Sequence, residues 1–183
     1  MNKAYLFLAT GFEEVEALTV VDLLRRGGVD CKMVSVTGDY DVIGSHAITI
    51  RADQLFEEGQ LDDAKMLIMP GGIPGTPNLK AHRGLEQLIR KYAADGKLLA
   101  AVCAAPTIYG EMGLLEGKKA TCYPGMEDGL VGAIPLTDAV VCDGQFITSR
   151  GMGTSIEFGL KLLEQFTDSA TAADLGNKIV YNV

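Results

Sequence analysis

The sequence predicts an α/β domain in which helices cover both faces of a mostly parallel sheet. Two observations support this prediction. Apolar runs of strand length alternate with longer segments of helical periodicity, which is the pattern of repeated strand–helix–strand units. The runs are apolar almost throughout, as expected for strands buried on both faces. Because 183 residues, 48% of them hydrophobic, suit one sizeable core, we expect a single domain over residues 1–183.

Most elements follow from their apolar spacing and from the residues at their ends. Gly27 and Gly28 end the first helix, and Glu86 and Arg90 are spaced to pair on the polar face of the second. Buried strands are expected over residues 4–9, 31–36, 65–70 and 97–103. Helices are expected over 13–26, around 85–92, from about 105, over 154–166 and over 171–182. In the helix over 154–166, the apolar residues in line are Ile156, Leu160 and Leu163.

Two further segments predict antiparallel pairing. Residues 41–50 indicate a hairpin or a pair of short strands, and residues 138–150 indicate a hairpin with Asp143 and Gly144 at its turn. In parallel α/β sheets the functional site lies outside the carboxyl ends of the strands. Four stretches that directly follow apolar runs meet this condition: residues 10–16, 70–78, 103–106 and 149–155.

Composition excludes several classes of function. The net charge is −8 and the chain has no basic stripe, so nucleic acid is not an expected partner. The N-terminal apolar run, residues 4–9, is too short for a signal peptide or a membrane span, and we expect a cytoplasmic protein. The four cysteines form no CxxC pair and the two histidines stand far apart, so we expect neither a metal site nor another cofactor.

Cys103 closes an apolar strand and precedes a predicted helix. Pro106 suits the first helical turn, where its missing N–H has no partner to lose. Cys103 therefore lies on a sharp strand-to-helix turn, the geometry of a nucleophile elbow. The helix N-terminus is expected to lower the pKa of the thiol, and the N–H groups of Ala104 and Gly72 are candidate donors to an oxyanion. From topology alone, a packing role for Cys103 is an equal alternative.

Glu16 is the second candidate catalytic residue. It lines up with Val20 and Leu23 on the apolar stripe of the first helix, whereas Glu13 and Glu14 suit the first turn by complementing the helix dipole. A buried carboxyl beside a thiolate is expected to take up a proton. Glu16 would then donate a hydrogen bond to the sulfur and move protons during catalysis.

A Cys-His-acid triad in the order that amidotransferases use needs a histidine after Cys103. The two histidines, His46 and His82, both precede Cys103 and suit surface or loop positions. A hydrolase or amidotransferase is therefore the least favoured function. The glycine-rich residues 149–155 lack the spacing of a phosphate loop. They predict a tight turn, with Gly151 lining the same pocket as Cys103 and with Thr154 or Ser155 near the helix cap.

Taken together, these motifs resemble the ThiJ/PfpI superfamily, specifically its branch around the parkinsonism-associated protein deglycase. The resemblance spans nearly the whole chain and rests on GFEEVEA, DLLRRGG, MPGGIPGTPNL, AVCAAPT and ITSRGMGTSIEFGLKLLE in this order. It implies a flavodoxin-like three-layer α/β/α sandwich and a homodimer. It also implies that Cys103 is the reactive, oxidation-sensitive cysteine, that Glu16 is a protonated glutamate on its sulfur, and that Gly72 and Ala104 supply the oxyanion pocket.

Three positions depart from this family's usual pattern. Tyr123, in TCYP, stands where well-known members carry a histidine, and tyrosine is a poor base at neutral pH. Met152 replaces a common proline in the glycine-rich turn, and His46 falls where an arginine is common. A histidine-dependent step is therefore not expected, which leaves a dyad of Cys103 and Glu16. The changes at Met152 and His46 are expected to alter the shape of the pocket and its binding of anionic groups.

Two functions of different classes remain. The first is a cofactor-free enzyme of the glyoxalase or deglycase type, in which Cys103 attacks a small reactive carbonyl and Glu16 moves the protons. The second is a redox-sensing stress protein or holdase chaperone that responds to oxidation of Cys103. Cys122 is a possible resolving thiol in such a response, although a packed cysteine is the favoured interpretation. No residue supports a thiamine-related site.

Overall fold

The computed structural model describes residues 2–181. Its central sheet has seven strands in the order β10-β11-β7-β6-β1-β2-β5. Neighbouring strands run parallel except β10, which is antiparallel to β11. The strands are β1 Lys3–Leu8, β2 Asp30–Ser35, β5 Gln54–Leu55, β6 Met66–Met69, β7 Leu98–Val102, β10 Val140–Asp143 and β11 Phe146–Ser149.

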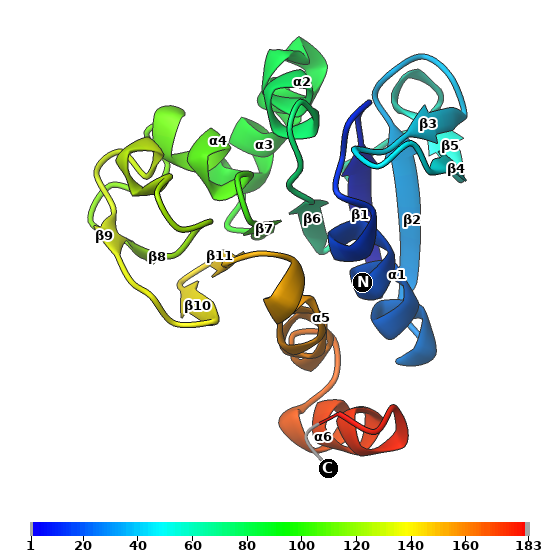
Figure 1. The fold of residues 1–183 in the computed structure, drawn as a ribbon, viewed down its shortest axis with the longest axis vertical. Coiled ribbons are helices and arrows are strands. Elements are labelled where there is room, and N and C mark those ends of the chain that lie inside the picture. Colours follow the sequence, from blue (N-terminus) through cyan, green and yellow to red (C-terminus); the bar gives the residue numbers. More distant parts are fainter. Residues whose placement is uncertain (1, 182–183) are drawn as a thin grey trace.

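Helices cover both faces of this sheet (Figure 1). Alternate residues of β1 supply the two cores: Leu6 and Leu8 pack in the cluster of α1 and α5, and Tyr5 and Phe7 pack in the cluster of α3 and α4. One layer holds α1 Glu14–Arg26, α5 Ser155–Glu164 and α6 Ser169–Lys178. The other holds α2 Gly75–Ala81, α3 Arg83–Ala94 and α4 Pro106–Glu111. The predicted three-layer, flavodoxin-like α/β/α sandwich is confirmed.

Two small sheets and three 3₁₀ turns complete the architecture. Strands β3 Asp41–Ile43 and β4 Thr49–Arg51 form an antiparallel pair, as predicted for residues 41–50. Strands β8 Lys119–Ala120 and β9 Ile134–Pro135 pair in parallel. The 3₁₀ turns are Phe56–Glu58, Glu127–Gly129 and Met152–Thr154.

The structure corrects the sequence predictions in a few places. The turn of the β10–β11 hairpin is Gly144-Gln145, because Asp143 still pairs with Phe146. Residues 70–78 contain the start of a short helix, α2, that the sequence did not predict. Ile156 is 37% exposed, because α5 turns Phe158, Leu162 and Leu163 inward instead. The last predicted helix ends at Lys178, and Asn182 lies outside the described residues.

The four stretches singled out at strand ends meet at one edge of the sheet, since β11, β7, β6 and β1 are neighbours. Backbone hydrogen bonds join them: Glu13 N–H donates to Gly71 O at 2.9 Å, and Cys103 N–H donates to Ser149 O at 3.0 Å. Residues 10–16, 70–78 and 103–106 thus form one contiguous surface with the glycine-rich turn. Within residues 2–181, no helix combines the length and the apolar character needed to cross a membrane.

Candidate active site

Cys103 lies on the predicted elbow between β7 and α4. Its backbone takes a left-handed conformation with φ of +64°, which is uncommon for a residue with a side chain. Ala105 stands at the N-cap position of α4, and Pro106 occupies the first helical position as expected. A left-handed residue other than glycine stores about 1–2 kcal/mol of strain. Such strain is concentrated at functional sites, where the surrounding structure holds it in place.

Glu16 approaches this cysteine from the first turns of α1. Its side chain is 1% exposed, and its Oε2 accepts a hydrogen bond from Gly71 N–H at 2.9 Å. Burial raises the pKa of Glu16 to about 7, against opposing hydrogen bonds from the Cys103 side chain and the Gly71 backbone. The negative charge of Glu13 raises it further. Glu16 therefore gains or loses its proton near neutral pH, where a proton shuttle is most effective.

The thiol pKa shifts in the direction opposite to the one predicted. Burial and the Glu16 carboxylate raise the pKa of Cys103 to about 12. The backbone N–H groups of Gly72 and Ala104 act in the other direction by favouring the charged sulfur, but they do not outweigh burial. Since a charge on either group disfavours a charge on the other, Cys103 and Glu16 titrate as a pair. A neutral Glu16 removes this repulsion and leaves the N–H groups to stabilise the thiolate.

Two consecutive glycines let the chain pass beside the sulfur. A Cβ on Gly71 would lie 2.5 Å from the Cβ of Cys103 and 2.7 Å from Oε2 of Glu16. Gly72 has φ of +95°, and its Cβ would lie 2.5 Å from the backbone nitrogen of Glu13. Gly71 is thus a site residue that sequence reasoning missed, although the Gly-Gly pair after β6 was a usable signal.

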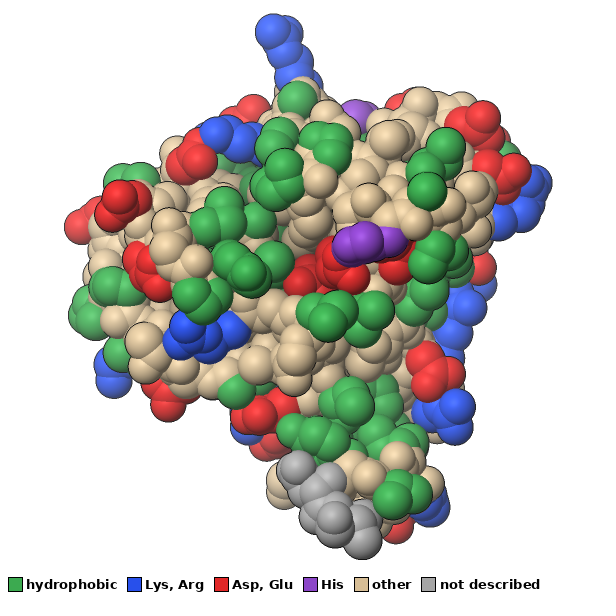
Figure 2. Space-filling model, viewed as in Figure 1, with side chains coloured by type: hydrophobic (Ala, Val, Ile, Leu, Met, Phe, Trp, Pro, Cys, Tyr) green, Lys and Arg blue, Asp and Glu red, His purple; other side chains and the backbone are tan. Residues whose placement is uncertain are grey.

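Tyr123 and Gly151 also reach the site. Tyr123 N–H donates to Cys103 O at 2.8 Å. A Cβ on Gly151 would lie 3.5 Å from Cδ2 of Tyr123 and 3.8 Å from Oε1 of Glu16. Met152 follows at the start of a 3₁₀ turn and is 55% exposed. Viewed as in Figure 1, acidic side chains and a histidine lie near the middle of the visible face, with hydrophobic side chains on several sides (Figure 2).

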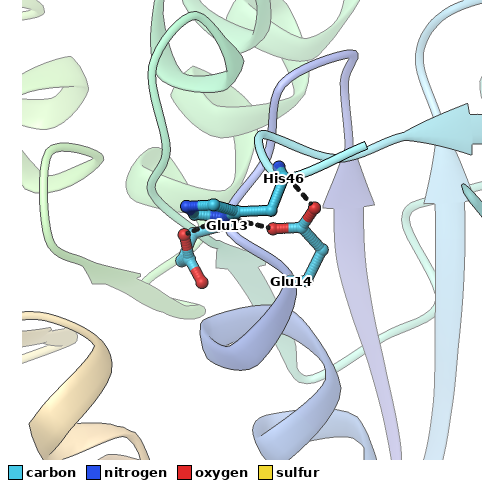
Figure 3. Close-up of side chains that lie close together, drawn as sticks. All are labelled: Glu13, Glu14 and His46. Atoms are coloured by element: carbon cyan, nitrogen blue, oxygen red, sulfur yellow. Dashed lines mark hydrogen bonds and ion pairs between the residues drawn. The ribbon is translucent and has the colours of Figure 1, made fainter. Parts of the chain in front are cut away.

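Glu13, Glu14 and His46 form a second cluster that the sequence did not predict (Figure 3). Glu14 is buried, and its Oε1 accepts from His46 N–H at 2.7 Å. The His46 imidazole lies 3.0 Å from Glu14 and 3.5 Å from Glu13. Burial of the carboxyl raises the pKa of Glu14, but hydrogen bonds from His46 and Ser45 outweigh burial and lower this pKa to about 2. Glu14 thereby fixes the β3–β4 loop against α1.

The side chains of this cluster could also hold a metal ion. Potential ligand atoms of Glu13, Glu14 and His46 lie within 4.8 Å of one another. Hydrogen bonds among the same groups account for the arrangement. Elsewhere, His82 Nδ1 accepts from Leu85 N–H and caps α3. Cys122 is buried, and its thiol donates a hydrogen bond to the carbonyl oxygen of Tyr123 at 3.5 Å. This environment is typical of a packed cysteine.

Known proteins resemble this chain in sequence and in fold. The model of the DJ-1/PfpI family matches residues 2–165. Protein DJ-1 homolog B of Arabidopsis thaliana is 39% identical over 98% of the chain, which spans 41% of that relative. A protein named deglycase from Pyrococcus abyssi is 31% identical over 79% of the chain and 87% of its own length. Oxidized Toxoplasma gondii DJ-1 superimposes with a TM-score of 0.94 at 30% identity, covering 99% of each chain. The chain belongs to the DJ-1/PfpI family.

Proposed function

We propose that the protein is a cofactor-free enzyme that acts on small reactive carbonyls through Cys103 and Glu16. The observation that carries this proposal is the contact between them: a buried carboxyl with a pKa of about 7 beside a sulfur on a strained elbow. An acid that titrates near neutral pH suits repeated proton transfer within one reaction. The similarity to a relative named deglycase supports the same reaction class.

The proposed reaction converts an α-oxoaldehyde and one water into a 2-hydroxy acid. The Cys103 thiol gives its proton to the Glu16 carboxylate as the sulfur adds to the aldehyde carbon, and the resulting alkoxide takes that proton back from Glu16 to give a hemithioacetal. The Glu16 carboxylate then removes the hydrogen from that carbon and returns it to the neighbouring carbon through an enediol. The hydroxyl proton of the first carbon passes to the second oxygen, which leaves a thioester.

Water then hydrolyses the thioester, releases the hydroxy acid and restores the thiol. The aldehyde carbon is oxidised by two electrons and its neighbour is reduced by two, so no external oxidant or reductant takes part. The N–H groups of Gly72 and Ala104 suit the oxyanions formed in the addition and hydrolysis steps, because they already favour negative charge on the sulfur. Tyr123 borders the site as a hydrogen-bond donor and not as a base.

Conversion of methylglyoxal to lactate tests the proposal. Wild type is compared with Cys103→Ser and Glu16→Gln, and Cys142→Ser is the matched control because Cys142 is exposed on β10. We expect a rate well above the buffer background that falls at least ~100-fold in the first two variants and persists in the control. Lactate formation that survives in Cys103→Ser would overturn the mechanism.

Oxidation sensing is the second candidate function. It is favoured by the same N–H groups, which suit a sulfinate on Cys103, and by the similarity to an oxidized DJ-1. Two equivalents of peroxide convert the thiol to the sulfinate and yield two waters. Peptide-resolved mass spectrometry after limited peroxide distinguishes a sensor, in which Cys103 oxidises first, from even oxidation of all four cysteines, which counts against one.

We further propose that the protein forms a homodimer through the N-terminal end of α1 and the adjoining β3–β4 hairpin. Val15, Ile43 and Ile48 are 46–51% exposed there, and large apolar side chains on neighbouring elements suit an interface. Light scattering of wild type and Ile48→Glu checks this, with a monomeric wild type as the contradicting result. The cytoplasmic location stays a prediction from the sequence.

A further inference from the structure

Three large apolar side chains on the loops that build the site are exposed to solvent. Ile73, Tyr123 and Met152 are 62%, 51% and 55% exposed, and we call them the apolar collar. Single exposed apolar residues are common on protein surfaces, but several on the loops of one site favour a binding function.

Each collar residue follows or contacts a residue of the site. Ile73 follows Gly72, whose N–H lowers the pKa of the Cys103 thiol. Tyr123 donates its N–H to the carbonyl oxygen of Cys103. Met152 follows Gly151, where an added Cβ would contact both the Tyr123 ring and the Glu16 carboxyl. Each of the three loops therefore carries one exposed apolar side chain next to a residue of the site.

The charged side chains that act on the reactive pair are carboxylates. Glu16 is the charged group that raises the pKa of the thiol, and Glu13 in turn raises the pKa of Glu16. The nearby cations are engaged elsewhere: His46 pairs with Glu14 and Glu13, and Arg150 donates to the carbonyl oxygen of Thr137 at 2.8 Å. The N–H groups of Gly72 and Ala104 serve the reacting oxygen, so among the described residues a carboxylate or phosphate on the substituent meets mainly the carboxylates of Glu13 and Glu16.

We propose that this site selects neutral carbonyl compounds with an apolar or aromatic substituent and discriminates against anionic ones, because the collar contacts the substituent. This specificity rests on the proposed carbonyl chemistry at Cys103. The probe is phenylglyoxal, which with one water gives mandelate by the same internal transfer of two electrons. Its aryl ring meets the collar, whereas methylglyoxal offers a single methyl group.

Initial rates for three substrates test the specificity. We expect kcat/KM for phenylglyoxal to exceed that for methylglyoxal by about tenfold, and that for 4-carboxyphenylglyoxal to fall at least about tenfold below phenylglyoxal. Tenfold corresponds to about 1.4 kcal/mol, the contribution of about 55 Å² of buried apolar surface. Equal kcat/KM values for phenylglyoxal and its carboxylated analogue would overturn the inference and leave the proposed function intact.

Collar variants show which side chains are responsible. In Ile73→Ser and Met152→Ser the ratio of kcat/KM for phenylglyoxal to that for methylglyoxal is expected to fall about fivefold, mainly through KM. Val131→Ser is the matched control, because Val131 is 54% exposed and belongs to the segment between β8 and β9. A ratio that stays at the wild-type value in both collar variants would remove the collar from substrate recognition.

Alkylation of Cys103 tests the collar without turnover. Iodoacetamide, N-benzyliodoacetamide and iodoacetate differ in their apolar and charged groups, and mass spectrometry follows the modified peptide, with glutathione as the reference thiol. Relative to glutathione, we expect the benzyl reagent to react about fivefold faster than iodoacetamide and iodoacetate about tenfold slower. This order of alkylation rates in a protein without turnover would refute the enzymatic function and retain the selectivity of the site. Equal relative rates for the three reagents would refute the selectivity alone.

Discussion

The proton on Glu16 makes a prediction about stability as well as about catalysis. Replacing the residue by glutamine keeps its size and its ability to accept from Gly71 N–H, but removes the titration. In the wild type, folding raises the pKa from 4.5 to about 7, so the folded chain binds the proton more tightly than the unfolded chain. The stabilising contribution is therefore full below pH 4.5 and is lost as the pH rises through 7.

The pKa shift sets the size of this effect. The interval between 4.5 and about 7 corresponds to about 3 kcal/mol at 1.36 kcal/mol for each pKa unit. Glu16 is 1% exposed, so solvent screening reduces the figure little. Between pH 5 and pH 8, the wild type is expected to lose about 2–3 kcal/mol of unfolding free energy that Glu16→Gln retains.

Urea unfolding of both proteins at half-unit steps from pH 5 to pH 8 measures the difference. Titration of His46 affects wild type and variant alike, because its contacts with Glu13 and Glu14 are the same in both. Subtracting the two curves therefore isolates Glu16. Parallel curves, with a constant difference across this range, would refute a carboxyl whose pKa is raised by burial.

Three further predictions concern stability and geometry. Cys103→Gly should be about 1 kcal/mol more stable than Cys103→Ala in urea unfolding, because glycine relieves the left-handed strain at φ +64°; equal stability would contradict it. Gly71→Ala should abolish lactate formation and lower the unfolding free energy by about 1–3 kcal/mol, because the added Cβ would clash with Cys103 and Glu16. Normal turnover in this variant would refute the close packing. Glu14→Gln should remove only the Glu14 share of the stability that wild type loses as the pH falls from 4.5 towards about 2, because Asp62, Asp63 and Asp168 also have lowered pKa values. Acid unfolding measures this share, and a transition identical to that of wild type would count against the lowered pKa of Glu14.

Local patterns predict the fold and the edge of the sheet at which the candidate site lies. Cys103 stands between an apolar strand and a proline-started helix, and these signals lie within a few residues of each other. Glu16 was recognised as a polar residue on an apolar stripe. Both predictions rest on the fact that parallel strands bring their carboxyl ends to one edge of a sheet.

Features that depend on distant contacts were not predictable in this way. The thiol pKa depends on burial and on a charge from another element, so the helix N-terminus alone gave the wrong direction. The clamp of Glu14 on His46 joins residues 32 apart in the sequence. Helix α2 was missed because Pro74, Gly75 and Pro77 suggested a loop, although prolines are tolerated before and within the first turn of a helix.

Direct titration of Glu16 is the sharpest test of the account, because the proposed chemistry depends on a proton held beside Cys103. Carbon-13 NMR of side-chain carboxyls, assigned by comparison with Glu16→Gln, gives its midpoint. We predict a midpoint near pH 7 that moves upward in Cys103→Ala, since the hydrogen bond from Cys103 lowers the pKa of Glu16. A midpoint near the ordinary value of 4.5, unchanged in Cys103→Ala, would contradict it.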